Sequence, residues 1–234
     1  MKTAIILSAG KGSRMGADIP KQYLELAGHP IIYYPLKAFQ ESIVEQIVLV
    51  CSKNDREFCE KLVKENSFDK VVCVVEGGKE RYHSVYNGLK AAPNTDYVFI
   101  HDGARAFIDQ QTINNCYEDV KKYEACVAAV PVKDTIKISK DGYIDSTPDR
   151  KTLYSMQTPQ TFSYPLIMDA YEKLIEQENE ILNKGISVTD DTFVLELFSD
   201  KKVYISDGSY NNIKITTPED LLMGELLLKG MRKG

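Results

Sequence analysis

Residues 1–26 read MKTAIILSAGKGSRMGADIPKQYLEL. The apolar, partly β-branched run at 4–7 predicts a buried strand, and it leads directly into a loop with three glycines. Runs of the same kind occupy 3–8, 46–51, 70–75, 96–101 and 125–130. Segments with helical periodicity lie between them; Tyr82, Val85 and Leu89, for example, fall on one helix face. This alternation predicts an α/β fold in which helices flank a mostly parallel, Rossmann-like sheet.

Polar segments follow three of the predicted strands. They cover residues 8–16, 76–81 and 101–105. Ligands of open parallel sheets bind beyond the carboxyl ends of the strands. We therefore expect these three segments to converge on one binding site.

The alternation stops after Pro131. Residues 132–160 contain two strand-like pieces around Asp141-Gly142, which is a hairpin signal. An excursion of this length is typical of a lid or an interaction arm. Helices are predicted at about 164–177 and 190–197, a strand near 201–206, and a last helix that begins with Thr217 as N-cap and Asp220 completing a capping box. The sequence thus predicts a single domain, 1–234, with a protruding arm.

Composition excludes several classes of protein. The 29 Lys and Arg against 34 Asp and Glu give a net charge of −5, which argues against nucleic acid or a membrane surface as a partner. The apolar run at 4–7 is too short for the core of a signal peptide, so we expect a cytoplasmic protein. The five cysteines include no C-x-x-C pair, which favours free thiols over a zinc site.

The glycine-rich loop fits neither familiar phosphate-binding fingerprint. No Gly-Lys-Ser/Thr completes a P-loop, and Met15 stands where a dinucleotide fingerprint needs its third glycine. The small residues can still present backbone N–H groups to anionic oxygens, while Arg14 and Lys21 add positive charge. Such a loop could hold the phosphates of a nucleoside triphosphate; the alternative is a glycine-rich turn with solvated cations.

Eight short motifs in order resemble the sugar-phosphate cytidylyltransferases, most closely the 2-C-methyl-D-erythritol 4-phosphate cytidylyltransferase family of isoprenoid synthesis. They are SAGKGSRMG, PKQYL, EGGKERYHSVYNGL, HDGAR, PVKDTIK, DRKTLYSMQTPQTF, TDD and NIKITTPEDL. The resemblance implies a nucleotidyltransferase fold. It also implies transfer of CMP from CTP to 2-C-methyl-D-erythritol 4-phosphate with release of pyrophosphate.

The resemblance also assigns roles to residues. The catalytic set is Arg14, Lys21, Arg150 and Lys214. The nucleotide-binding set is Ser8, Ala9, Gly10, Lys11, Gly12, Gly77, Gly78, Arg81 and Ser84. The substrate-binding set is Arg105, Thr135 and Thr189. Asp102 matches the residue beside Mg²⁺, the expected cofactor, although an aspartate that ends a strand also suits an Asx turn.

In the relatives the arm crosses a two-fold dimer, so the resemblance implies a homodimer in which Arg150 serves the neighbouring subunit. Two positions depart from the family pattern: Lys79 replaces an acidic residue, and Ala106 replaces a proline. We expect helix capping from Asp190 and Asp191, and a structural hydrogen bond rather than proton transfer from His101.

Three alternatives stay open at this point. The first is the sister branch that uses ribitol 5-phosphate. The second is a non-catalytic nucleotide-binding dimer on the same scaffold, which would lack the cations present here. The third is an NAD-dependent oxidoreductase, which the failed fingerprint disfavours.

Overall fold

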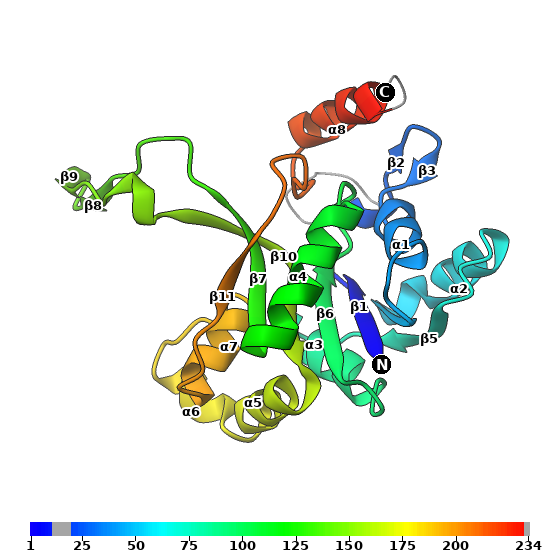
Figure 1. The fold of residues 1–234 in the computed structure, drawn as a ribbon, viewed down its shortest axis with the longest axis horizontal. Coiled ribbons are helices and arrows are strands. Elements are labelled where there is room, and N and C mark those ends of the chain that lie inside the picture. The colour runs from blue at the N-terminus through cyan, green and yellow to red at the C-terminus, as the bar shows by residue number, and fades with distance from the viewer. Residues whose placement is uncertain (11–19, 232–234) are drawn as a thin grey trace.

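The computed structural model describes residues 1–10 and 20–231. Among these residues a seven-stranded sheet has the order β11-β7-β10-β6-β1-β4-β5. The strands are β1 (Lys2–Ser8), β4 (Gln46–Cys51), β5 (Val71–Glu76), β6 (Tyr97–Asp102), β7 (Ala125–Pro131), β10 (Tyr154–Ser163) and β11 (Tyr204–Asp207). Only β10 runs antiparallel to its neighbours, β6 and β7. The predicted mostly parallel α/β fold is thus confirmed (Figure 1).

Helices cover both faces of the sheet because alternate side chains of its central strands are apolar on both sides. Ala4 and Ile6 of β1 join one core cluster, whereas Ile5 joins the other. The first face is covered by α1 (Tyr33–Gln40), α2 (Arg56–Glu65) and α4 (Gln110–Tyr123). The second is covered by α3 (Arg81–Lys90), α5 (Tyr164–Glu176), α6 (Glu178–Asn183) and α7 (Asp191–Phe198).

The remaining elements lie beyond the carboxyl edge of the sheet. The short pair β2 (Glu25–Leu26) and β3 (His29–Pro30) packs with α8 (Pro218–Met231) around Leu26 and Phe107. The predicted capping box of α8 is present: the backbone N–H of Asp220 donates to Thr217 Oγ1, and that of Thr217 donates to the Asp220 carboxylate. In the described part of the chain, no helix has the length and apolar character needed to cross a bilayer.

The arm leaves the sheet after β7 and carries the hairpin of β8 (Ile138–Lys140) and β9 (Tyr143–Ser146). Asp141 and Gly142 form its turn with φ of 51° and 83°, the left-handed pair expected for this sequence. The predicted range 132–160 is too long. Tyr154 already pairs with Pro131, so the excursion ends at 153 and the following residues belong to β10.

Candidate active site

A cleft of about 430 Å³ opens at the carboxyl ends of β1, β5 and β6. This is where the strand order reverses, since β4 and β5 lie on one side of β1 and β6 on the other. Eight of the predicted site residues line the cleft: Ala9, Gly10, Lys21, Gly78, Arg81, Ser84, Asp102 and Lys214. The expectation that the three polar segments converge is confirmed.

The loop after β5 packs tightly against the loop after β1. A Cβ atom on Gly77 would lie 2.4 Å from Ala9 Cβ, so only glycine permits this approach. The backbone N–H of Gly78 donates to Ser84 Oγ at 3.0 Å, which joins the loop to the first turns of α3. Ser84 therefore shapes the wall of the cleft.

Gln22 is a site residue that the sequence analysis missed. Its Nε2 donates to the carbonyl oxygens of Ser8, at 2.5 Å, and Gly10, at 3.0 Å. Ser8 does not itself line the cleft; it is buried and its Oγ donates to the hydroxyl of Tyr23. The PKQYL segment thus fixes the end of β1 and places Lys21 beside it. The sequence offered one signal for Gln22: it directly follows Lys21, a predicted catalytic residue.

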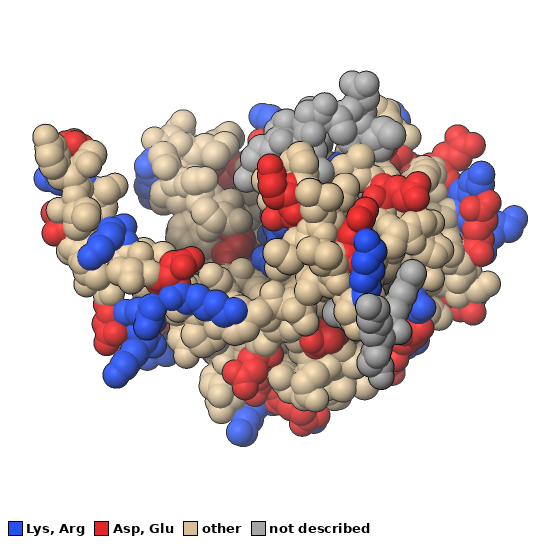
Figure 2. All heavy atoms as spheres, turned by 90° about the horizontal axis from the view of Figure 1, so that it is seen from above, with Lys and Arg blue, Asp and Glu red and all other residues tan. Residues whose placement is uncertain are grey.

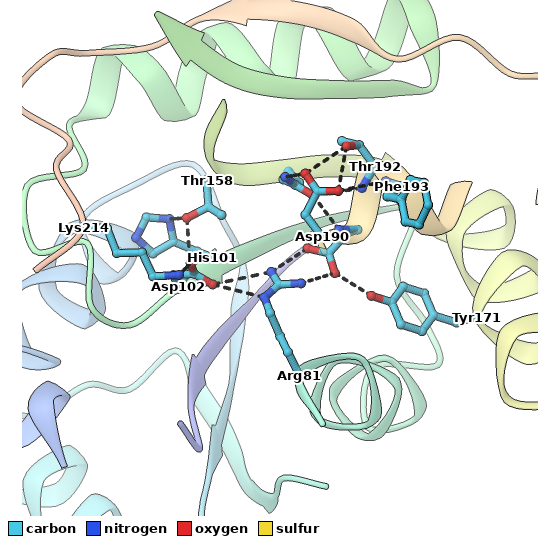
Figure 3. Close-up of polar contacts among 11 residues, drawn as sticks. Arg81, His101, Asp102, Thr158, Tyr171, Asp190, Thr192, Phe193 and Lys214 are labelled. Carbon is cyan, nitrogen blue, oxygen red and sulfur yellow. Dashed lines mark hydrogen bonds and ion pairs between the residues drawn. The ribbon is translucent and has the colours of Figure 1, made fainter. Parts of the chain in front are cut away.

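Charged side chains from four distant segments meet around Asp102 (Figure 3). Lys214 Nζ lies 2.6 Å from Asp102 Oδ2, and the Arg81 guanidinium lies 3.4 Å from Asp102 Oδ1. Arg81 also makes two bonds of 2.8 Å to the carboxylate of Asp191, a side chain with no exposed surface. The result is a row of alternating charge from α7 through α3 and β6 to the segment after β11.

This row keeps Asp102 ionised. Burial alone would raise the pKa of its carboxyl, but the positive charges of Arg81 and Lys214 hold the pKa well below its usual range. Burial likewise opposes the charge of Arg81, and the carboxylates of Asp191 and Asp102 outweigh it, so the pKa of Arg81 is raised. Among the described residues, four cations, Lys21, Lys79, Arg81 and Lys214, line the cleft against the two carboxylates of Asp102 and Glu80, so the lining carries a net positive charge.

Arg105 lies beside this group without lining the cleft. Its Nη1 donates to the carbonyl of Asn212 and its Nη2 to that of Met156. Its buried Nε has no hydrogen-bond partner among the described residues. Burial lowers the pKa of Arg105, Asp102 partly restores it and Arg81 lowers it further. An anion bound here would relieve a desolvated and incompletely paired guanidinium.

His101 has the structural role that the sequence suggested. Its Nε2 faces the carbonyl oxygen of Arg105 at 3.2 Å, so that nitrogen carries the ring proton. Its Nδ1 then accepts from Thr158 Oγ1 at 3.0 Å, and the same hydroxyl oxygen accepts from the backbone N–H of Asp102. Burial lowers the pKa of His101 to about 4, which suits a neutral ring holding the end of β6 in place.

Besides Ser8, Gly77 and Arg105, three predicted residues lie outside the cleft lining. Thr135 and Arg150 belong to the arm and are exposed, as is Thr189 before α7. Arg150 Nη1 donates to the carbonyl of Lys133 across the base of the arm. Lys11, Gly12 and Arg14 fall outside the described residues.

Asp190 and Asp191 have different roles, although helix capping was expected of both. Asp190 is the N-cap of α7, and its carboxylate accepts from the backbone N–H of Phe193 at 2.9 Å. For Asp191 the expectation was wrong, because its carboxylate points to Arg81 and the Tyr171 hydroxyl instead. Figure 3 shows the bonds of Asp190 to Thr192 and Phe193.

Comparison with known proteins settles the family. The model of the 2-C-methyl-D-erythritol 4-phosphate cytidylyltransferase family matches residues 2–230. The chain belongs to this family. Its curated relatives include the 2-C-methyl-D-erythritol 4-phosphate cytidylyltransferases of Lachnospira eligens, 49% identical over 98% of this chain and 100% of the relative, and of Clostridium novyi, 47% identical over 98% and 97%.

Solved structures of the same family share the fold. The 4-diphosphocytidyl-2C-methyl-D-erythritol synthase of Anaerococcus prevotii is 33% identical and superposes with a TM-score of 0.84, covering 97% of this chain and 96% of that one. The Francisella tularensis cytidylyltransferase is 30% identical with a TM-score of 0.76. Membership of the cytidylyltransferase family makes this chain a nucleotidyltransferase, as its motifs predicted, and favours that class over the oxidoreductase and non-catalytic alternatives.

Proposed function

We propose that the protein transfers CMP from CTP to 2-C-methyl-D-erythritol 4-phosphate (methylerythritol phosphate below) and releases pyrophosphate. The observation that carries the proposal is the electropositive cleft, in which Lys21, Arg81 and Lys214 lie at the carboxyl edge of a family-typical sheet. In the described part of the chain, the lining holds four cationic side chains and only two carboxylates, Asp102 and Glu80, so it attracts anionic groups such as a triphosphate and a sugar phosphate.

The nucleotide is placed by backbone and charge. We assign the triphosphate to the end of β1, where Ala9 and Gly10 expose backbone groups and Lys21 adds charge, with Lys11, Gly12 and Arg14 completing the loop. We assign the pyrimidine to the loop of Gly77, Gly78 and Ser84, because Gly78 and Ser84 line the cleft and the glycines bring the backbone close to Ala9. Lys79 lines the same wall.

The reaction is an in-line displacement. A phosphate oxygen of methylerythritol phosphate attacks the α-phosphorus of CTP, a new P–O bond forms, and the bond to the bridging oxygen of pyrophosphate breaks with its electron pair. A phosphate monoester is mostly dianionic at neutral pH, since its second pKa is near ~6, so no general base is required. Lys214 orients the attacking phosphate, and Lys21 with Arg14 stabilises the charge that develops in transfer.

Mg²⁺ belongs to the proposal as a companion of the triphosphate. Within residues 1–10 and 20–231 no three His, Cys, Asp or Glu side chains are grouped as a metal site. The ionised Asp102, which lines the cleft, is the residue that would hold a metal bound mainly by phosphates and water. When bound, the ion would neutralise triphosphate charge and help pyrophosphate to leave.

The arm supplies the rest of the site from a second subunit. Thr135 and Arg150 are exposed and stand on an element that makes few contacts with its own chain, as the open space beside the arm in Figure 2 shows. We propose a homodimer in which the partner's arm reaches the cleft. Thr189 and Arg105 complete the pocket of the sugar phosphate.

A cytoplasmic location is also proposed, because the substrates are charged metabolites and all five cysteines are free thiols, which suits a reducing compartment. The test of the whole proposal is pyrophosphate release with Mg²⁺, each of the four nucleoside triphosphates, and either methylerythritol phosphate or ribitol 5-phosphate. Release only with CTP and methylerythritol phosphate supports it. Selective release with ribitol 5-phosphate would transfer the protein to the sister branch.

A further inference from the structure

Asp191 is a buried acid outside the cleft. Its side chain has no exposed surface and is absent from the cleft lining, so it touches neither substrate directly. Its carboxylate is nevertheless fully engaged: both oxygens accept from Arg81 at 2.8 Å, and Oδ1 also accepts from the Tyr171 hydroxyl at 2.5 Å. Its backbone N–H donates to Gln160 Oε1 at 2.8 Å. Burying a charged side chain costs free energy, so a fully buried carboxylate next to a binding site needs an explanation.

The bonds from Asp191 lead to the cleft through Arg81. Two parallel hydrogen bonds between a guanidinium and a carboxylate fix the plane of the guanidinium as well as its position. In that position, Nε and Nη2 of Arg81 each lie 3.4 Å from Asp102 Oδ1. Asp102 in turn holds Lys214 at 2.6 Å through its other oxygen. Arg81 is thus the bridge between a buried carboxylate and one on the cleft wall (Figure 3).

We infer that Asp191 is a positioning residue: it holds Arg81, which orients the Asp102 carboxylate, and so sets where the Lys214 ammonium group lies. This inference rests on the proposed function, in which Lys214 orients the attacking phosphate. The contact between Arg81 and Asp102 is long, so it is the strong pair with Asp191 that keeps the guanidinium in place. Without Asp191, Arg81 would be free to turn toward Asp102 or toward a bound phosphate, and Lys214 would lose its fixed partner.

The main test is steady-state pyrophosphate release by Asp191→Asn with CTP and methylerythritol phosphate. We expect kcat to fall by about 10- to 100-fold, because a small displacement of an orienting group has an effect of that size. The fall should lie mainly in kcat, with KM for CTP near the wild-type value. Asp190→Asn is the matched control: it removes the same charge one residue away, weakens the cap of α7, and should leave kcat close to wild type.

A double-mutant cycle tests the route through Arg81. In an Arg81→Gln background, Asp191→Asn should cause no further loss of kcat, since the bridge is already broken. Independent, multiplied losses would overturn the inference. So would an Asp191→Asn enzyme that melts at a lower temperature and keeps full kcat per folded molecule, because Asp191 would then only stabilise the fold.

Two further measurements keep the inference testable if Asp191→Asn fails to fold. Such a failure is a risk, because loss of one partner of a buried ion pair is strongly destabilising. Arg81→Lys is therefore assayed as well: it keeps the charge but cannot bridge two carboxylates, and full turnover in this variant would overturn the inference. Crystal structures of the wild type and Asp191→Asn give a readout without activity. Should the wild type release no pyrophosphate from CTP, the proposed function fails. Independently of activity, Arg81 and Lys214 in unchanged positions in Asp191→Asn would refute the positioning role, whereas a displaced guanidinium or a displaced Lys214 ammonium group would support it.

Discussion

The cleft and the arm differ in how far their side chains are buried and paired. In the cleft, Asp102 is almost fully buried and each of its oxygens has a cationic partner from another element. On the arm, Tyr143 and Ile144 are 78% and 68% exposed, and the hairpin packs mainly on itself. The base of the arm is tied to the body by few contacts, among them Lys133 over the ring of Tyr210.

This difference teaches where the geometry of each functional residue comes from. Lys214 and Arg81 are fixed by the fold of a single chain. Arg150 and Thr135 are not, because an isolated two-stranded hairpin is only marginally stable in water. The exposed Tyr143 and Ile144 are the side chains that the proposed dimer would cover. The predictions below separate these two kinds of residue.

The largest expected effect belongs to the cleft. Lys214→Ala should lower kcat by about 100- to 1,000-fold, the usual loss when one group that acts on developing charge is removed. Its melting temperature should also fall, because the buried Asp102 then keeps only the longer contact to Arg81, so kcat is compared per folded molecule. Steady-state pyrophosphate release and thermal unfolding measure the two. A Lys214→Ala enzyme with normal turnover would place the attacking phosphate elsewhere.

The second prediction asks whether the arm acts on the partner's cleft. Lys214→Ala and Arg150→Ala should each be nearly inactive alone. When the two are unfolded and refolded together, half of the dimers are mixed, and each mixed dimer has one site without a substitution. Activity should then recover to about a quarter of wild type. No recovery, with mixed dimers demonstrated by mass, would mean that each arm serves its own chain.

The third prediction concerns the pH dependence of the body. His101 stays neutral in the folded protein down to a pKa of about 4, whereas an unfolded histidine protonates near pH 6.5. Protons therefore bind the unfolded chain first, and the free energy of unfolding should fall by about 3 kcal/mol as pH drops from 6.5 to 4. His101→Gln should lack this part of the slope in urea titrations. Asp102 contributes separately, below about pH 4, where its unfolded form takes up a proton.

The smallest expected effects come from two substitutions, one at the start of α7 in the body and one in the hairpin turn of the arm. Asp190→Ala removes the cap of α7 and should cost about 1 kcal/mol, lowering the melting temperature by about 2–4 °C. Gly142→Ala forces a side chain into φ of 83°, at a similar local cost. Because that turn lies in the exposed arm, the melting temperature of dilute protein should not change, while dimerisation weakens. Calorimetry measures the melting temperatures and analytical ultracentrifugation measures dimerisation. If Gly142→Ala lowered the melting temperature as much as Asp190→Ala, the arm and the body would unfold as one unit.

Local patterns predicted the fold well where apolar residues dominate. The five core strands, the hairpin turn at Gly142 and the capping box at Thr217 were all visible in sequence. The strand β10 was not, because most of its buried positions are polar. Gln160 binds the start of α7, Thr158 binds His101 and Asp102, and Gln157 donates to the carbonyl of Ser209. A strand of this kind has no apolar run to reveal it.

The site followed the same rule. Residues at the ends of predicted strands, such as Ala9, Gly78 and Asp102, were found because strand ends converge. The pairing of Arg81 with Asp191 joins residues 110 positions apart, and no local pattern specifies which carboxylate faces which cation. Motifs alone assigned Asp191 to capping, since an acidic residue in the first turn of a helix is favourable in any case.

The most direct test of the account is a crystal structure of the protein with CTP and Mg²⁺. We predict that the nucleotide lies in the cleft between the strand ends of β1 and β5, with its phosphates beside Gly10 and Lys21 and an arm of the partner subunit closing over it. Nucleotide bound elsewhere, with this cleft empty at saturating CTP, would contradict the account.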